Sequence, residues 1–332
     1  MTAFDDGANH AHINSDRHQK GPAMRILSLG AGAIGGYYGL RLAEAGADVT
    51  LLVRPGRAAQ LERDGLVVAS RGEVRRRRLP VVQAGQVGGP FDVVLLTCKA
   101  YDLGPAMEAI APAMGPGSLV LPLLNGIAHL DALDERFGTA RVLGGVAYIA
   151  TMMEADGTIR HAGPADTLVV GDRSGAVTPE VRALAEAYVA GGVAARASEG
   201  ILQDLWEKWC MLAPGAALTC LMHGTVGEVM ATEDGPAIAR GRLAEARAIA
   251  AAHGHAPRPP AVALADRTLT DPQSRWAASM MRDIQQGAPR VEAEHIIGDL
   301  IRRGRERGLD SPLLAAAFGH LQVYNAQGGR AA

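Results

Sequence analysis

The chain has 332 residues, of which 48% are apolar and 20% charged. This length and composition suit two ordinary domains with a sizeable core. A net charge of −2 gives no reason to expect nucleic acid or an anionic membrane as a partner, and three scattered cysteines exclude a disulfide framework, which favours a reducing cytoplasm.

Residues 1–23 are polar and lack the apolar core of a signal peptide, so we expect a disordered N-terminal extension before a fold that begins near Met24. The longest uncharged run extends from Trp209 to Gly227 and contains Pro214 and several glycines. This composition favours a buried helical region over a membrane span.

A glycine motif follows the first predicted strand, Ile26 to Leu29, and precedes a helical pattern that continues to Ala45. The motif has the spacing G-x-G-x-x-G and consists of Gly30, Ala31, Gly32, Ala33, Ile34 and Gly35. The first glycine allows a tight turn, the second lets the backbone approach a pyrophosphate, and the third lets the helix pack closely on the strand. The context predicts a dinucleotide site, and a glycine-rich turn without a ligand is the alternative.

The residue after the second strand, predicted over 49–53, discriminates between cofactors. An NAD site usually places an acidic residue there for the ribose 2′-hydroxyl, whereas an NADP site needs a cation for the 2′-phosphate. Here Arg54 follows the strand, Arg57 lies nearby, and Asp48 comes too early. We therefore expect NADP(H), with a surface role for Arg54 as the alternative.

Polar residues follow two further predicted strands. Lys99 comes directly after the strand over 91–98, and Asn125 follows the strand over 118–124. In an open parallel sheet, ligands bind at the carboxyl ends of the strands, so both are candidate site residues. A surface lysine and a turn asparagine are the alternatives.

The remaining strands are predicted from shorter patterns. Residues 66–82 predict a β-hairpin, whose basic run over 75–78 we interpret as a solvated face rather than a nucleic-acid patch. Segments 144–153 and 167–171 predict a strand pair that could extend the sheet. A helix over 179–188 and a strand over 193–197 complete this part of the chain.

From residue 198 the pattern becomes alanine-rich and helical. Helices are expected over 201–211, after Pro236, around 274–286 and over 292–307. Lys208 lies on the first of these, beside its apolar face. No Cys and His cluster has zinc spacing, and no G-x-S-x-G nucleophile elbow is present.

Five motifs occur in a characteristic order: GAGAIGG near the start, CKAYD at 98–102, LLNGI at 123–127, I-x-x-x-x-W-E-K at 201–208, and SMMRDIQQG at 279–287 followed by VEAEHIIG. From Met24 onward the chain resembles the ketopantoate reductase family, the NADP-dependent 2-dehydropantoate 2-reductases. The resemblance implies an α/β Rossmann dinucleotide-binding domain, here 24–197, followed by an all-α C-terminal domain, here 198–332, with the site in the cleft between them.

The same resemblance implies hydride transfer from NADPH to the ketone of 2-dehydropantoate, which gives (R)-pantoate for pantothenate and coenzyme A synthesis. It implies that Lys208 is the catalytic lysine and that Lys99 and Asn125 lie near the cofactor and the reacting carbon. It further implies that Ser279 contacts the substrate carboxylate and that Glu292 holds the substrate hydroxyl. Glu294 is an alternative for the last role, because the alignment there needs one extra residue.

The chemistry agrees with this assignment. Ketone reduction needs a hydride at carbon and a proton at oxygen, and a lysine can stabilise the developing charge and donate the proton if burial or a nearby cation lowers its pKa. Trp206 and Trp209 flank Lys208, which favours partial desolvation. A surface lysine on an amphipathic helix is the alternative.

Three positions depart from the family pattern, since Leu212, Ala216 and Val226 stand where pantoate enzymes often carry asparagines. The substrate could therefore be a less polar 2-oxo acid, or be reached through water, Thr219 or His223. A non-catalytic NADP-binding sensor is an alternative of another class. The sequence leaves the oligomeric state open, a homodimer included, and gives no sign of a metal site.

Overall fold

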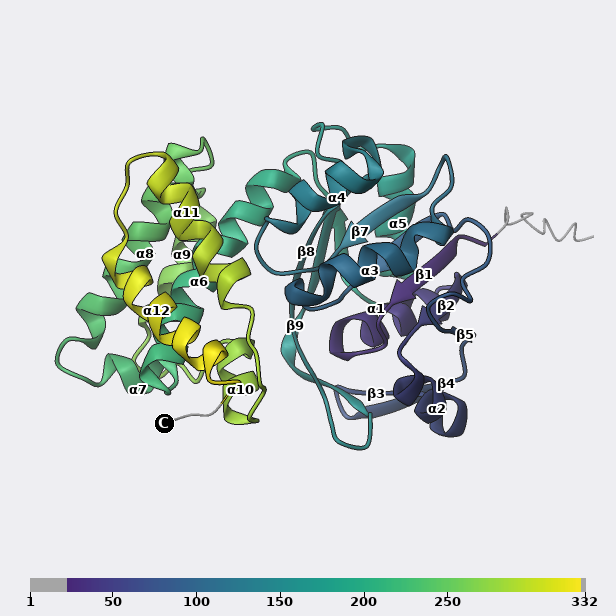
Figure 1. The fold of residues 1–332 in the computed structure, drawn as a ribbon, viewed down its shortest axis with the longest axis horizontal. Coiled ribbons are helices and arrows are strands. Elements are labelled where there is room, and N and C mark those ends of the chain that lie inside the picture. The colour runs from purple at the N-terminus through teal and green to yellow at the C-terminus, as the bar shows by residue number, and fades with distance from the viewer. Residues whose placement is uncertain (1–22, 330–332) are drawn as a thin grey trace, which may run out of the picture.

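The computed structural model describes residues 23–329. The predicted N-terminal extension, 1–23, lies outside the described residues except for Ala23. Helices gather on one side of the molecule and two sheets on the other (Figure 1). This arrangement confirms the predicted fold class, while the division of the chain at residues 197 and 198 stays a prediction.

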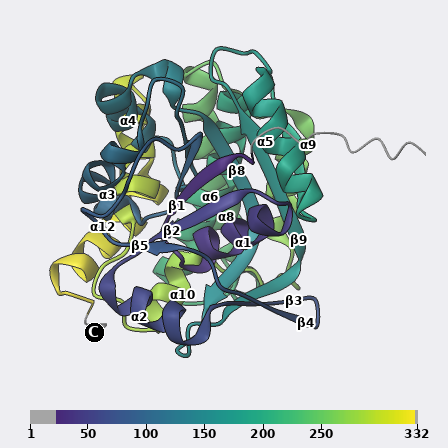
Figure 2. The ribbon, with the colours of Figure 1, turned by 90° about the vertical axis from the view of Figure 1, so that its right-hand side faces the viewer.

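The first sheet has five strands in the order β5-β2-β1-β6-β7, and every pair in it is parallel. Its strands are β1 (Arg25–Leu29), β2 (Asp48–Leu52), β5 (Val81–Val82), β6 (Val93–Leu96) and β7 (Leu119–Pro122). The order reverses between β1 and β6, which is where open α/β sheets bind ligands. Helix α1 (Ala33–Glu44) lies on one flank, and α3 (Leu103–Ile110) and α4 (His129–Phe137) lie on the other (Figure 2). Helix α2 (Pro55–Asp64) follows β2.

The second sheet corrects two expectations. Strands β3 (Leu66–Ser70) and β4 (Glu73–Arg77) form the predicted hairpin, but β5 leaves it and pairs with β2 of the first sheet. Strands β8 (Gly144–Met153) and β9 (Ile159–Gly171) do pair antiparallel, but they join β3, β4 and β10 (Ala194–Ala197) rather than extending the first sheet. Helix α1 contacts strands of both sheets, so its apolar residues are buried on two sides, and α5 (Pro179–Ala190) covers β9 and β10.

The helical domain is built around α6 (Ile201–Met222), which contacts α8, α9, α10 and α12 and also β8. The sequence predicted this helix only to residue 211, but it continues through Pro214 because a single proline removes one backbone donor and the surrounding helices stabilise the rest. The other elements are α7 (Val226–Met230), α8 (Gly235–Ala252), α9 (Pro259–Thr270), α10 (Ser279–Gln285), α11 (Asp299–Glu306) and α12 (Pro312–Ala326). The helix expected around 274–286 begins only at Ser279, and α9 and α12 were not predicted.

One buried apolar cluster joins the two domains. It continues from Leu27 and Val146 of the sheets to Leu205 and Trp209 of α6 and on into the helical core. Because this surface is excluded from water on both sides, it stabilises the docking of the helices on the sheets. Over residues 23–329, no helix is both long and apolar enough to cross a bilayer.

Candidate active site

The glycine motif forms a tight turn from β1 into α1. Gly30 has φ +96°, a conformation that favours glycine, and a Cβ on Gly35 would collide with the carbonyl oxygen of Gly30 and with Thr97 Oγ1. A Cβ on Gly32 would meet no described atom within 4 Å. Gly32 also caps α1 without a side-chain hydrogen bond, so no capping side chain occupies the N–H groups of the first turn. The turn therefore fits a dinucleotide pyrophosphate.

Two arginines lie beside this turn. Arg54 precedes α2, its side chain is 82% exposed, and its Nη2 lies 2.8 Å from Oδ2 of Asp102. Arg57 is one helical turn further on, and its Nε donates to the carbonyl oxygen of Ala31 at 3.0 Å while its Nη1 donates to Gly157 at 3.0 Å. Burial lowers the pKa of the Arg57 guanidinium. Arg57 thus touches the glycine turn directly, whereas Arg54 stands at its edge.

Lys208 and Asn125 meet across the two domains. Lys208 lies in the second turn of α6, and its Nζ donates to Oδ1 of Asn125 at 3.1 Å. Asn125 lies in the loop that follows β7, as expected for a residue at the carboxyl edge of the sheet. Burial lowers the pKa of Lys208 to about 8, and the Tyr148 ring of β8 lies 6.0 Å from the amine.

Lys99 makes a second contact between the domains. Its Nζ lies 2.8 Å from Oδ2 of Asp283 on α10 and 3.2 Å from Oε2 of Glu292. The other oxygen of Glu292 accepts a hydrogen bond from the Ala100 N–H at 2.9 Å. Burial alone would lower the pKa of Lys99, but the two carboxylates outweigh it and raise that pKa. Sequence reasoning missed Asp283, although it lies one helical turn after Ser279.

The structure distinguishes the two candidate glutamates. Glu292 is 9% exposed and faces the first domain through Lys99 and Ala100. Glu294 is exposed and pairs on the surface with Arg302 at 3.3 Å and Gln322 at 3.0 Å. Glu292 therefore fits a role at the domain interface better than Glu294 does.

Ser279 begins α10 and is partly exposed. Its hydroxyl has no hydrogen-bond partner within residues 23–329, so it stays available to a ligand. Four residues later on the same helix, Asp283 binds Lys99, which places Ser279 near the contact between the domains.

The positions that depart from the family pattern have different environments. Ala216 and Val226 are 1% and 0% exposed and belong to the helical core, whereas Leu212 is partly exposed one turn beyond Lys208. The Thr219 hydroxyl donates to the Gly215 carbonyl at 2.8 Å and accepts from the Ala278 N–H, so it is occupied by backbone groups. His223 ends α6, and its Nε2 lies 3.4 Å from Nε2 of His320.

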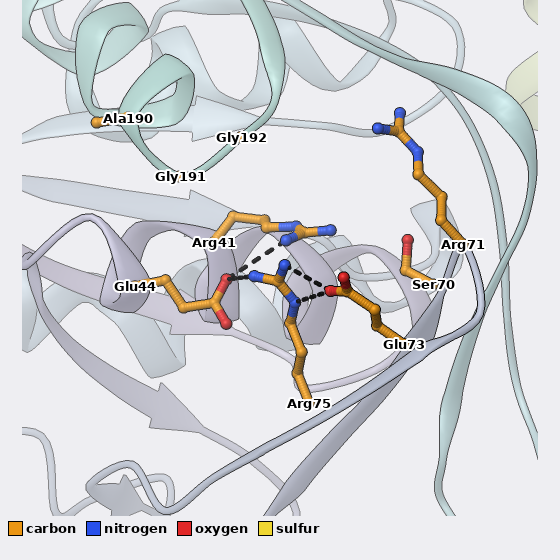
Figure 3. A pocket seen from close by; sticks show the side chains of 9 residues that line it. All are labelled: Arg41, Glu44, Ser70, Arg71, Glu73, Arg75, Ala190, Gly191 and Gly192. Carbon is orange, nitrogen blue, oxygen red and sulfur yellow. Dashed lines mark hydrogen bonds and ion pairs between the residues drawn. The ribbon is translucent and has the colours of Figure 1, made fainter.

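A cavity of about 370 Å³ lies away from all of these residues, at the other end of α1. In Figure 3, Arg75 lies between Glu44 and Glu73, and Arg41 also reaches Glu44. The charges that line this cavity are therefore largely paired with one another. A smaller cavity of about 240 Å³ is lined by Glu292, His295 and residues of both domains, and it borders the candidate site.

Comparison with known proteins identifies the family of the chain. The family model "Ketopantoate reductase PanE/ApbA" matches residues 26–175, and the model "Ketopantoate reductase PanE/ApbA C terminal" matches residues 200–325. The uncharacterized oxidoreductase YkpB of Bacillus subtilis is 35% identical over 306 residues, which are 92% of this chain and 100% of that protein. The 2-dehydropantoate 2-reductase of Mesorhizobium japonicum is 30% identical over 321 residues, covering 89% of this chain and 96% of that one.

Solved structures share the fold over the whole molecule. A PanE/ApbA family ketopantoate reductase from Ralstonia eutropha superposes with a TM-score of 0.82 at 28% identity, covering 92% of this chain and 100% of that one. D-Mandelate dehydrogenase in complex with NADH and anilino(oxo)acetate has the same TM-score at 22% identity, covering 91% and 98% of the two chains, which shows the shared fold. The two matched models cover most of the described residues, and the chain therefore belongs to the ketopantoate reductase family of oxidoreductases.

Proposed function

We propose that this protein reduces the ketone of a 2-oxo acid with NADPH, and that 2-dehydropantoate, which would give (R)-pantoate, is the first substrate to test. The observation that carries the proposal is the contact between Lys208 and Asn125, which joins a partly buried amine of α6 to the domain with the glycine turn. Family membership and the relative from Mesorhizobium japonicum support the choice of substrate.

The glycine turn would hold the cofactor. Its bare backbone and the N-terminus of α1 suit the pyrophosphate, and Arg54 and Arg57 supply the cations that a 2′-phosphate needs. Lys99 would face the nicotinamide end, because it follows β6 at the same edge of the sheet as Asn125. When bound, the reduced nicotinamide supplies the hydride.

Lys208 would act as the general acid. With a pKa of about 8, the amine is mostly protonated at neutral pH and yet is a stronger acid than an exposed lysine. An ammonium has three N–H donors, and Asn125 accepts from one of them. The remaining donors can bind the carbonyl oxygen, stabilise its developing negative charge and release a proton to it.

Ser279 and Glu292 would orient the substrate. The free hydroxyl of Ser279 can donate to a carboxylate. Glu292 is held by Lys99 and by the Ala100 N–H, and its remaining lone pairs can accept a hydrogen bond from a substrate hydroxyl. Ser279 would thus bind the carboxylate, and Glu292 the hydroxyl, of a hydroxylated 2-oxo acid.

A less polar 2-oxo acid is the second candidate, because Leu212 presents an apolar side chain one turn from Lys208 where the family often has asparagine. Oxidation of NADPH and of NADH with a panel of acids, including 2-dehydropantoate, 2-oxoisovalerate and phenylglyoxylate, separates the candidates. The proposal fails if none of these acids supports oxidation above the rate of Lys208→Ala. Tight NADPH binding without turnover would instead favour the sensor alternative.

A further inference from the structure

Two histidines from different domains meet near the contact between Lys208 and Asn125. His129 is the first residue of α4, and His295 lies in the π-helical segment Glu294–Gly298 that leads into α11. Nδ1 of His129 lies 3.2 Å from Nε2 of His295, and the ring centroids are 5.4 Å apart. Only one of the two nitrogens can donate in a neutral pair, so the contact is a hydrogen bond with one donor and one acceptor.

His295 also contacts the loop that carries Asn125. The Asn125 backbone lies close enough to the His295 ring to raise its pKa. Gly126 has φ +75°, and a Cβ there would lie 3.0 Å from the carbonyl oxygen of His295 and 3.3 Å from its ring Cδ2. The loop therefore packs directly on His295, while the side chain of Asn125 accepts from Lys208 on the other side.

We propose that His129 and His295 are positioning residues, whose hydrogen bond fixes the loop bearing Asn125 and thereby the direction in which Lys208 presents its protons. This inference rests on the proposed function. Both histidines act through Asn125 and contact neither substrate nor cofactor. The hydrogen bond between His129 and His295 holds His295 against the loop, so a change in either histidine can move Asn125.

The surroundings of His129 require it to be neutral. Its side chain is 1% exposed, and burial lowers its pKa well below the ordinary value, with further lowering by His295, Arg173 and Lys208. The N-terminus of α4 adds positive potential, which also disfavours a cation at its first residue. A proton taken up here would place a charge in an apolar interface between two domains.

Groups that raise and groups that lower the pKa both surround His295. Burial lowers its pKa, Glu292 and Asp299 together with the Asn125 backbone raise it, and Arg302 lowers it. His295 also lines the cavity of about 240 Å³, which gives its ring a route to solvent. His295 is therefore the member of the pair that a solvent proton can reach at acid pH, and the charge would weaken the packing that positions Asn125.

The first test uses substitutions matched to the two ring nitrogens. His129→Asn and His295→Gln place an amide where Nδ1 and Nε2 lie, whereas His129→Leu and His295→Leu remove the hydrogen bond. The leucine variants should lose about 10- to 100-fold in kcat through misplacement of the acid, with the KM for the cofactor unchanged. Both amide variants should keep most of kcat. His295→Gln should lose the acid limb of the pH profile, because an amide does not titrate, whereas His129→Asn should keep it, because His295 can still take up a proton. His320→Leu, in a histidine pair outside the site, is the control and should behave as wild type.

The second test needs no substrate, so it separates this inference from the proposed function. The rate of acetylation of Lys208 by acetic anhydride is followed against pH by peptide mass spectrometry. Displacement of the loop in His295→Leu should let water reach the amine and raise the midpoint of that profile above about 8, because burial is what lowers the pKa of Lys208, while His295→Gln and His320→Leu keep it. A shifted profile in a protein that reduces no 2-oxo acid would support the positioning and reject the proposed function.

Two results would overturn the inference. One is a His295→Leu variant that folds, as judged by circular dichroism and melting, and has the wild-type kcat and acetylation profile. The other is an acid limb that persists in His295→Gln, since the titrating group would then lie elsewhere. If the leucine variants do not fold, His295→Gln still decides the question through its pH profile.

Discussion

Burial disfavours the charged form of the Lys208 amine and lowers its pKa from the ordinary value of 10.5 to about 8. The amine is therefore mostly protonated below about pH 8. In the proposed mechanism reduction requires the protonated amine, so we expect kcat/KM to be constant near neutrality and to fall as pH rises through about 8. Lys208→Ala should lower turnover by about 100-fold or more with little change in cofactor binding. Initial rates from pH 6 to 10, with fluorescence titration of NADPH, test both statements, and unchanged turnover would remove Lys208 from the mechanism.

Arg54 and Arg57 are separated by one helical turn but differ in their contacts. Arg54 is exposed and pairs with Asp102 at the surface, whereas Arg57 is held by the carbonyls of Ala31 and Gly157. We expect Arg54→Asp to shift preference toward NADH by removing a cation from the 2′-phosphate. Arg57→Asp should instead weaken both cofactors, because it disturbs the glycine turn. The ratio of kcat/KM for NADPH and NADH measures this difference, and an unchanged ratio in Arg54→Asp would place the 2′-phosphate elsewhere.

At the scale of single elements, the turn from β1 into α1 gives a test that separates binding from folding. A Cβ at Gly32 meets open space, so Gly32→Ala should fold with wild-type stability but block the close approach of a pyrophosphate. Gly104→Ala on α3 adds the same methyl group in open space outside the site and is the matched control. We expect cofactor affinity to fall about 10-fold or more in Gly32→Ala only, as measured by titration calorimetry. Equal affinities in the two variants would mean that no phosphate lies against Gly32.

Sequence patterns predict well those elements whose signal lies within a short stretch of the chain. The glycine spacing, the apolar strands and the polar residues at strand ends led to the first sheet and to Lys99 and Asn125, because each signal lies within one strand and its turn. Lys208 came from the family resemblance, since a lysine on an amphipathic helix carries no local signal of a site. The second sheet was misassigned because the sequences of β8 and β9 do not indicate which strands they pair with, and β3 lies far away in sequence. Pairing of that kind depends on tertiary packing.

The contacts between domains were the least predictable part of the site. Lys99 binds Asp283 across 184 residues, and His129 binds His295 across 166. No periodicity connects such positions, since the contacts exist only once α10 and the π-helical segment dock on the sheet. The π-helical segment is itself a feature that propensities do not reveal, although such segments are frequent at functional sites.

For the whole molecule, the buried histidines predict how stability depends on pH. The pKa values of His129 and His295 are lowered by burial, so the unfolded chain takes up protons first as pH falls through about 6.5. Unfolding is thereby favoured, and we expect the melting temperature to decrease as the pH is lowered from about 6.5. His255 and His320, which are less buried, have pKa values lowered in the same direction. A smaller loss in His129→Asn than in wild type, measured by calorimetry between pH 5 and 8, assigns the effect to the domain interface.

The cavity of about 240 Å³ beside Glu292 has walls from both domains, including Tyr101 on one side and Asn325 on the other. A compound bound in this cavity would separate the two domains slightly and thereby move the Lys208 ammonium away from Asn125. Because Glu292 lines the same cavity and is proposed to hold the substrate hydroxyl, such an inhibitor would also compete with the oxo acid, and high concentrations of the oxo acid would relieve it.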